Sequence, residues 1–160
     1  DAPSSISRLI DMGIEKYLAA SSLKAVLAQR LLRTNCPNCL EDYEPHEVQL
    51  RLAGLEHTTE EIHFKRGTGC NKCRMTGYKG LTGIYELIEI DDVVSEMIIN
   101  GASDLQIRNY ADGRGYRPLF QSGLEKVLGG EVCLEELLRI TSLGEKVVSQ
   151  PSEERISISA

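Results

Sequence analysis

The chain has 160 residues, of which 41% are hydrophobic and 26% charged, so it can form one ordinary globular domain or two small ones. Its formal net charge of −6 argues against broad electrostatic binding to nucleic acid, which requires a basic surface. No apolar run approaches the roughly 20 residues that cross a bilayer, so we expect no membrane span and membrane contact only through a partner.

The first part of the chain predicts two helices followed by a strand. Ser4 or Ser5 can cap a first helix that ends near Gly13, and a second amphipathic stretch follows over residues 14–23. The apolar pattern then continues, and periodicity alone allows either a longer helix or a buried strand. We favour a strand near residues 27–33.

Two Cys-x-x-Cys pairs follow, and they are the strongest signal in the sequence. Cys36 and Cys39 form the first pair, and Cys70 and Cys73 form the second, thirty residues later. Each pair bends its chain into a tight knuckle in which two sulfurs face one ion, so two pairs complete a tetrahedron. Four thiolates of this kind indicate structural zinc, which is closed to water and therefore not catalytic.

Other uses of four cysteines fit less well. Two disulfides would require an oxidising compartment, and the opening Asp1-Ala2-Pro3 has none of the features of a signal peptide. A thioredoxin-like redox pair would leave the second Cys-x-x-Cys unexplained, and iron–sulfur clusters usually take other cysteine spacings.

The segment between the pairs is acidic, whereas the second pair lies in a basic stretch. A short helix after Pro45 and a brief strand at residues 62–66 are predicted there. We interpret the basic stretch as compensation for the negative zinc–thiolate centre, with a docking surface as the alternative. The cations are Lys65, Arg66, Lys72, Arg74 and Lys79. All three histidines, His46, His57 and His63, lie between the pairs, and we expect none to bind the metal because four cysteines already fill a tetrahedron.

The remainder of the chain predicts one strand followed by short helices. Residues 84–90 are the clearest strand, and Asp91 or Asp92 and then Ser103 are placed to cap the helices that follow it. Helices are predicted at residues 93–99, 104–110, 118–128 and 134–140, and residues 144–160 are predicted to be a flexible extension.

No catalytic group is visible in this sequence. Glu86 shares a strand face with Ile84 and Ile88, which predicts a buried salt bridge or an interface contact rather than a general base. Cys133 has no activating neighbour and is predicted to be a small buried hydrophobe. No phosphate-binding fingerprint occurs, because Gly113-Arg114-Gly115 is too short to be one.

The order and spacing of several segments resemble the C-terminal region of secretion and pilus-assembly ATPases, the hexameric motors of type II secretion and type IV pilus extension. The resemblance extends to about Thr141. Three positions depart from the family's pattern. Leu81 stands where arginine is usual, Lys16-Tyr17 replaces the more common Pro-Phe, and Gln121-Ser122-Gly123 lacks the acid often found before that glycine. The matching segments are 1–13, 20–23 and 28–33 before the first knuckle, Gly69 to Cys73 in the second, and Thr76 to Gly80 and Gly83 to Leu87 after it.

This resemblance implies an α+β fold that is a fragment of a longer protein. Residues 1–34 would be the trailing edge of a RecA-like α/β core, and residues 35–80 an inserted tetracysteine zinc subdomain. Residues 81–143 would be a strand plus a C-terminal subdomain of small helices, and residues 144–160 a flexible tail. The phosphate-binding and histidine boxes of the family would precede residue 1. The four cysteines, as zinc ligands, are therefore the only functional residues that the resemblance assigns to this chain.

The resemblance also implies cofactors and partners. Zinc would bind this chain, whereas ATP and Mg²⁺ would bind only the full-length protein, an ATP hydrolase. The partners would be neighbouring subunits of a homohexamer and platform proteins of the bacterial inner membrane, to which the cytoplasmic motor would be peripheral. The sequence does not separate a secretion motor from a pilus motor.

Two other readings remain open. One is a stand-alone zinc ribbon that binds nucleic acid or protein, and the other is a zinc site that only staples a small core.

Overall fold

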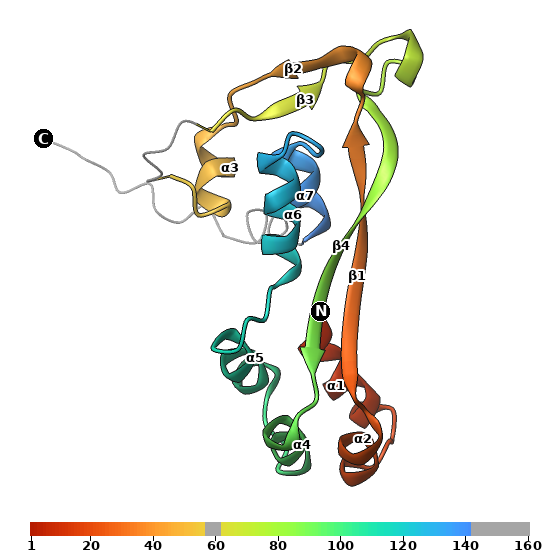
Figure 1. Ribbon diagram of the computed structural model, residues 1–160, viewed down its shortest axis with the longest axis vertical. Coiled ribbons are helices and arrows are strands. Elements are labelled where there is room, and N and C mark those ends of the chain that lie inside the picture. Colours follow the sequence, from red (N-terminus) through yellow and green to blue (C-terminus); the bar gives the residue numbers. More distant parts are fainter. Residues whose placement is uncertain (57–61, 142–160) are drawn as a thin grey trace, which may run out of the picture.

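The computed structural model describes residues 1–56 and 62–141, and its backbone is a long two-stranded antiparallel ribbon. Strand β1 (Ala25–Asn35) pairs with β4 (Tyr78–Glu89), from Ala25 opposite Glu89 to Arg33 opposite Leu81. The register shifts between Arg33 and Asn35, so that Asn35 lies opposite Tyr78. The ribbon runs along the long axis of the molecule (Figure 1). Residues 25–35 are therefore strand, as we favoured, and β4 begins six residues before the predicted strand.

Four helices gather around one end of the ribbon, the lower end in Figure 1: α1 (Ala2–Asp11), α2 (Lys16–Ser22), α4 (Asp92–Ile99) and α5 (Asp104–Asp112). Asp91 caps α4 and Ser103 caps α5, as predicted, each by accepting a main-chain N–H. The predicted cap of α1 was wrong. Asp1 accepts the N–H of Ser4, because the helix begins three or four residues earlier than a cap at Ser4 or Ser5 would allow.

The other end of the ribbon carries two further helices, α6 (Leu119–Leu128) and α7 (Leu134–Ile140), at the predicted positions. Next to them lies a small layer made of β2 (Leu40–Asp42), α3 (Glu47–Leu52) and β3 (Lys65–Gly67). In Figure 1 the two strands run across the top and α3 lies to the left of α6. Strands β2 and β3 pair antiparallel. The two 3₁₀ turns η1 (Pro37–Cys39) and η2 (Asn71–Cys73) carry the cysteine pairs.

The apolar residues form two separate cores along one face of the ribbon. The lower core joins α1, α2, α4 and α5 to Ile88, and the upper core joins α6, α7 and the small layer to Ile84 and Leu32. Because β-strand side chains alternate between faces, Ile84, Glu86 and Ile88 point to the same side. Glu86 therefore lies between the two cores.

Glu86 is only 2% exposed, and it accepts hydrogen bonds from the first residues of two helices. The N–H of Ala2, which begins α1, donates to Oε1 at 2.7 Å, and the N–H of Leu119, which begins α6, donates to Oε2 at 3.0 Å. The prediction of a buried salt bridge was wrong, because main-chain donors and the positive ends of two helix dipoles meet the carboxylate. Burial and contact with this carboxylate also raise the pKa of Tyr116.

The class of the fold is mixed helix and strand, as expected. The predicted flexible tail, residues 144–160, lies outside the described residues.

Candidate metal centre

The first cysteine knuckle forms where β1 ends. The N–H of Cys36 donates to the carbonyl of Gly77 at 2.8 Å, which ties the end of β1 to the start of β4. Pro37 then begins η1, and the N–H of Cys39 returns to the carbonyl of Cys36 at 3.3 Å. This turn brings both sulfurs of the pair to one side of the chain.

The second knuckle repeats this geometry in front of β4. In η2 the N–H of Cys73 donates to the carbonyl of Cys70 at 3.2 Å, and the N–H of Met75 reaches the same carbonyl at 2.9 Å. Arg74 and Met75 both have positive φ, at 53° and 63°. The chain thereby reverses tightly enough to return to Gly77 and enter β4.

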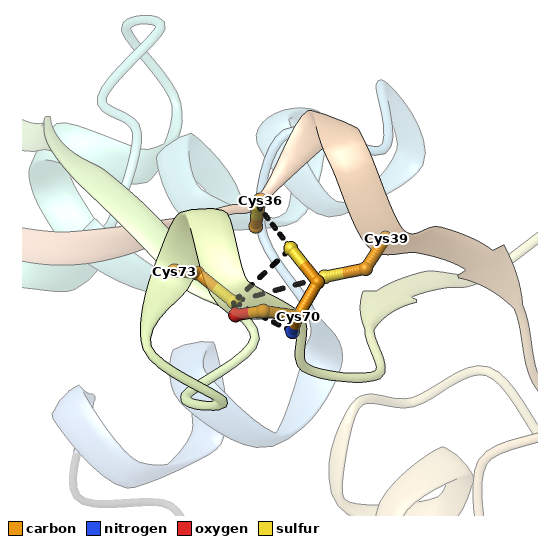
Figure 2. Close-up of side chains that lie close together, drawn as sticks. All are labelled: Cys36, Cys39, Cys70 and Cys73. Atoms are coloured by element: carbon orange, nitrogen blue, oxygen red, sulfur yellow. Dashed lines mark hydrogen bonds between the residues drawn. The ribbon is translucent and has the colours of Figure 1, made fainter.

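The two knuckles face each other and form one cluster of four sulfurs. Figure 2 shows Cys36 and Cys39 from one segment opposite Cys70 and Cys73 from the other. All four Sγ atoms lie within 4.8 Å of one another. The Sγ–Sγ distances are 4.0 Å for Cys36 and Cys70, 3.8 Å for Cys39 and Cys73, and 3.8 Å for Cys70 and Cys73. A tetrahedron of metal–sulfur bonds of about 2.3 Å has edges of roughly 3.8 Å, so the cluster has the dimensions of a tetrathiolate site.

Main-chain N–H groups point at the sulfurs. Gly69 donates to Sγ of Cys39 at 3.3 Å, while Cys70 and Gly77 each donate to Sγ of Cys73 at 3.2 Å. Such donors stabilise negative sulfur. Although burial works against ionisation, these two N–H groups lower the pKa of Cys73 to about 6.

The same cluster resists carrying several negative charges without a cation. Burial and the three neighbouring sulfurs raise the pKa of Cys39 to about 12. Four thiolates at these distances can coexist only around a positive ion, so the donor set fits a divalent metal.

Close backbone contact joins the knuckles to the small layer. A Cβ built on Gly67, the last residue of β3, would lie 2.0 Å from the carbonyl oxygen of Gly77. Buried Asn35 donates its side-chain amide to the carbonyls of Lys65 and Gly130, each at 3.0 Å, and its Oδ1 has no hydrogen-bond partner among the described residues. The cysteine cluster is therefore anchored to β3 and to the loop after α6.

A buried polar network lies beside the centre. Glu136 of α7 accepts hydrogen bonds from Arg33 and Arg139, and the guanidinium of Arg33 lies 3.9 Å from the ring centroid of Tyr78. The Tyr78 hydroxyl contacts Sγ of Cys133 at 3.4 Å. Cys133 is buried, as predicted, and it is the residue that directly precedes α7.

The structure thus brings together the four predicted ligands and none of the other candidates. Within the described residues, the only group of three or more metal-ligating side chains is the cysteine quartet. His46 precedes α3 and is exposed, His63 is exposed, and His57 lies outside the described residues. The N–H donors of Gly69 and Gly77 were not predicted, because a main-chain donor has no signature in the sequence beyond the glycine itself.

No helix in the described part of the chain is both long and apolar enough to cross a membrane.

Comparison with known proteins finds similarity along most of the chain. The sequence model of a family described as "Type II/IV secretion system protein" matches residues 1–139. The Type II secretion system protein E of Dickeya dadantii is 46% identical over 137 residues, which are 85% of this chain and 26% of that protein.

Two further relatives show the range of the similarity. The Type II secretion system ATPase E of Vibrio cholerae serotype O1 is 43% identical over 141 residues, covering 88% of this chain and 27% of the relative. The Type IV pilus assembly ATPase PilB of Thermus thermophilus is 38% identical over 142 residues, covering 88% of this chain and 16% of the relative. The chain therefore spans about a quarter, or less, of the length of these curated relatives.

Proposed function

The chain belongs to the family of type II/IV secretion system proteins, and from that premise we propose that it is the zinc-binding C-terminal portion of a hexameric ATPase that powers type II secretion or type IV pilus assembly. The observation that carries the proposal is the sulfur cluster, whose Sγ–Sγ distances match those of a tetrahedral zinc site. The cluster lies within the part of the chain that matches this family. ATP hydrolysis, with its Mg²⁺, belongs to the rest of the full-length protein. The protein works in the cytoplasm, at the inner membrane through its partners.

Metal content tests the zinc assignment directly. The purified chain should carry one zinc per molecule, with Cys36, Cys39, Cys70 and Cys73 as its ligands. Cys39→Ser should lose most of the metal, because three thiolates cannot close the tetrahedron. Cys133→Ser is the matched control, since Cys133 is buried and free outside the cluster, and it should keep one zinc. Retention of full metal by Cys39→Ser would reject the ligand set.

An exposed apolar face supports the idea that the ribbon packs against more protein. Leu27 and Leu87 lie opposite each other on the side of the ribbon away from the two cores, and they are 59% and 49% exposed. Leu31, Leu81 and Tyr85 share this side and are also exposed. A two-stranded ribbon with five large apolar residues open to water is unusual for a complete surface. We assign this face to contact with the RecA-like core, of which residues 1–34 would be the trailing edge.

A pair of substitutions tests that assignment. Leu27→Asp with Leu87→Lys should leave the melting temperature of the 160-residue chain nearly unchanged, since both side chains are already exposed and the two new charges attract each other across the strands. In the full-length protein the same pair should lower stability and ATP hydrolysis. Arg30→Asp, an exposed position on the same strand, is the control. Equal stability of both full-length variants would show that this face of the ribbon does not contact the RecA-like core.

The zinc subdomain, residues 35–80, acts in this proposal as a rigid docking element for platform proteins of the inner membrane. The support for this role is the rigidity of the two knuckles. A closed tetrathiolate site and the Gly67–Gly77 contact hold the knuckles as one body. Binding between the full-length motor and the cytoplasmic domains of its platform proteins should be lost in Cys39→Ser and kept in Cys133→Ser. Binding that survives zinc loss would contradict the docking role.

A further inference from the structure

The outer edge of β4 is open along its last residues. Backbone N–H and C=O groups of an antiparallel strand point alternately to its two sides. The N–H of Tyr85 donates to Oγ of Ser122 at 3.2 Å, and Ser122 belongs to α6 rather than to β1. Leu87 and Glu89 therefore also turn their backbone polar groups away from β1. Within the described residues no strand pairs with this side of β4, and these groups of Leu87 and Glu89 form no hydrogen bond there.

A groove of about 570 Å³ lies along this open edge. One wall is β4, and the other is the end of α5 with the connection that follows it, together residues 110–117. In Figure 1 the connection lies to the left of β4, whereas β1 lies to its right. The groove is thus bordered by a strand edge and a helix, an arrangement in which an extended peptide can add to a sheet.

The lining of the groove has an apolar floor and a charged rim. Its buried lining residues include Ile88, Val94 and Ala111, which belong to the lower core. The rim is exposed and carries Glu89 and Arg114. Glu89 forms no ion pair within the described residues. The groove therefore suits an extended segment that has apolar side chains on one face and a nearby cation.

The far wall limits what can enter the groove. The guanidinium of Arg114 donates to Oδ2 of Asp91 at 3.1 Å and lies 4.5 Å from the ring centroid of Tyr110, so this wall is held in place. Edge-to-edge pairing with a second copy would bring a whole ribbon and its helices to the side of β4 where α5 stands. A single added strand needs only about 4.8 Å beside β4.

The chain itself carries a segment with the matching pattern, among the residues that the structure does not describe. Residues 155–159 read Arg-Ile-Ser-Ile-Ser, an alternation typical of a half-buried strand. So short a segment cannot form a sheet by itself and needs an existing edge. Binding to such an edge can order a segment that has no structure of its own.

The length of the chain permits this contact. Helices α6 and α7 are joined by a short loop and run antiparallel, so α7 ends toward the level at which α6 begins (Figure 1). That level is Glu86 of β4, which accepts the N–H of Leu119. Packed elements lie about 10 Å apart, so two such layers place α7 roughly 20 Å from the edge of β4. The chain from Thr141 to Arg155 spans roughly 45 Å when extended.

We propose that residues 155–159 add to the open edge of β4 as a short third strand. Their backbone pairs with Leu87 and Glu89, and Ile156 and Ile158 pack on the apolar floor of the groove. The added strand lies in the plane of the ribbon, so it leaves the exposed apolar face free for the RecA-like core. It also closes an edge on which other chains could pair. The inference goes beyond the proposed function and needs neither the zinc nor the ATPase core, since the groove lies at the lower core.

Hydrogen exchange of the 160-residue chain, followed by NMR at single amides, tests the proposal. The amides of Leu87 and Glu89 should be protected, although no described residue accepts a hydrogen bond from them. Ile156→Pro with Ile158→Pro removes two backbone donors and both apolar side chains. Protection at the two amides should then fall about tenfold or more.

Two controls accompany this variant. Val147→Pro with Ser149→Pro makes the same change at the same spacing outside the segment, and it should leave the protection of the β4 edge unchanged. The amide of Ile88 faces β1 and reports the ribbon itself, so its exchange should be alike in all three proteins.

Dilution separates the chain's own segment from that of a second copy, because an intramolecular contact does not depend on protein concentration. Three results would overturn the inference. The first is exchange at Leu87 and Glu89 that is equally fast in the parent chain and in the Ile156→Pro, Ile158→Pro variant. The second is an equal loss of protection in the control variant. The third is protection that rises with protein concentration, which would identify a second copy as the occupant.

Discussion

At the scale of single residues, two buried carboxylates connect parts of the chain that are far apart in sequence. Glu86 receives the first N–H groups of α1 and α6, which lie 84 and 33 residues away. Glu136 receives the N–H and the guanidinium of Arg33, 103 residues away. Each carboxylate is satisfied by donors whose positions depend on the whole fold, and so each should matter to stability more than an exposed acid does.

Substitution of Glu86 tests the first connection. Glu86→Gln keeps the size of the side chain but turns an amide NH₂ toward one of two N–H donors, which leaves a buried donor unsatisfied. We expect the free energy of unfolding to fall by about 1–3 kcal/mol in urea titrations of the zinc-loaded chain. Glu89→Gln, exposed on the same strand, should cost little. Similar losses in the two variants would contradict the role of Glu86 as the link between the cores.

The pH dependence of stability tests the second connection. Although burial opposes ionisation, hydrogen bonds from Arg33 and Arg139 lower the pKa of Glu136 from 4.5 to about 2. The folded pKa lies below the unfolded one, so this stabilisation is complete above about pH 5 and is lost as the pH falls toward about 2. The difference in unfolding free energy between the parent chain and Glu136→Gln should therefore shrink over that range.

Glu135→Gln is the control for this titration, because Glu135 is the exposed neighbour. Loss of the proposed zinc in acid would be common to the three proteins and would cancel in the comparison. A constant difference between the parent and Glu136→Gln from about pH 6 to about pH 2 would show that Glu136 does not titrate as described.

At the scale of elements, the knuckles depend on a close backbone approach between β3 and the entry to β4. Gly67 and Gly77 meet with no room for a side chain on either residue, and Gly77 also has a φ of +77°. The same Gly77 donates its N–H to Sγ of Cys73 and accepts the N–H of Cys36. The four sulfurs can therefore reach their positions around a metal only when Gly67 packs against Gly77.

Gly67→Ala should for this reason weaken zinc binding without touching a ligand. Overpacking by one methyl group costs about 1–3 kcal/mol, and about 1.4 kcal/mol is a factor of ten in affinity. We expect zinc affinity to fall about tenfold in competition with a chromophoric chelator. Gly113→Ala is the control, because φ is negative there and the nearest atom to an added Cβ is 3.8 Å away. Unchanged zinc affinity in Gly67→Ala would separate the glycine contact from the metal site.

At the scale of the whole molecule, two cores share one ribbon and the sulfur cluster lies beyond the upper one. The lower core contains residues of α1, α2, α4 and α5 and no cysteine, whereas Leu32 and Phe64 of the upper core are close in sequence to the knuckles. The metal should therefore stabilise the upper end of the molecule and leave the lower end largely independent.

Chelation followed by hydrogen exchange measures this division. Removal of zinc should abolish protection at the amides of Gly69, Cys70 and Gly77, which donate to sulfur or depend on the closed knuckle. Amides within α1 and α4 should keep their protection, because the lower core is intact. Loss of protection in both regions at once would instead support a zinc site that staples the entire fold.

The sequence by itself determined the features that depend on neighbours along the chain. The Cys-x-x-Cys spacing identified the four residues whose sulfurs meet, Asp91 and Ser103 were found as caps, and the positions of α6 and α7 followed from their apolar period. The order of these segments also identified the family. Such signals are local, because turn geometry and capping involve residues only about three or four positions apart.

Only the tertiary structure decided what meets across long separations. It gave Glu86 two helix N-termini in place of an ion pair, and it placed Lys65 and Arg66 of β3 opposite Asp42 and Glu41 of β2. It also opened one face of the ribbon to solvent. The sequence pattern cannot show these outcomes, because a strand's alternation tells which residues share a face but not which elements cover it.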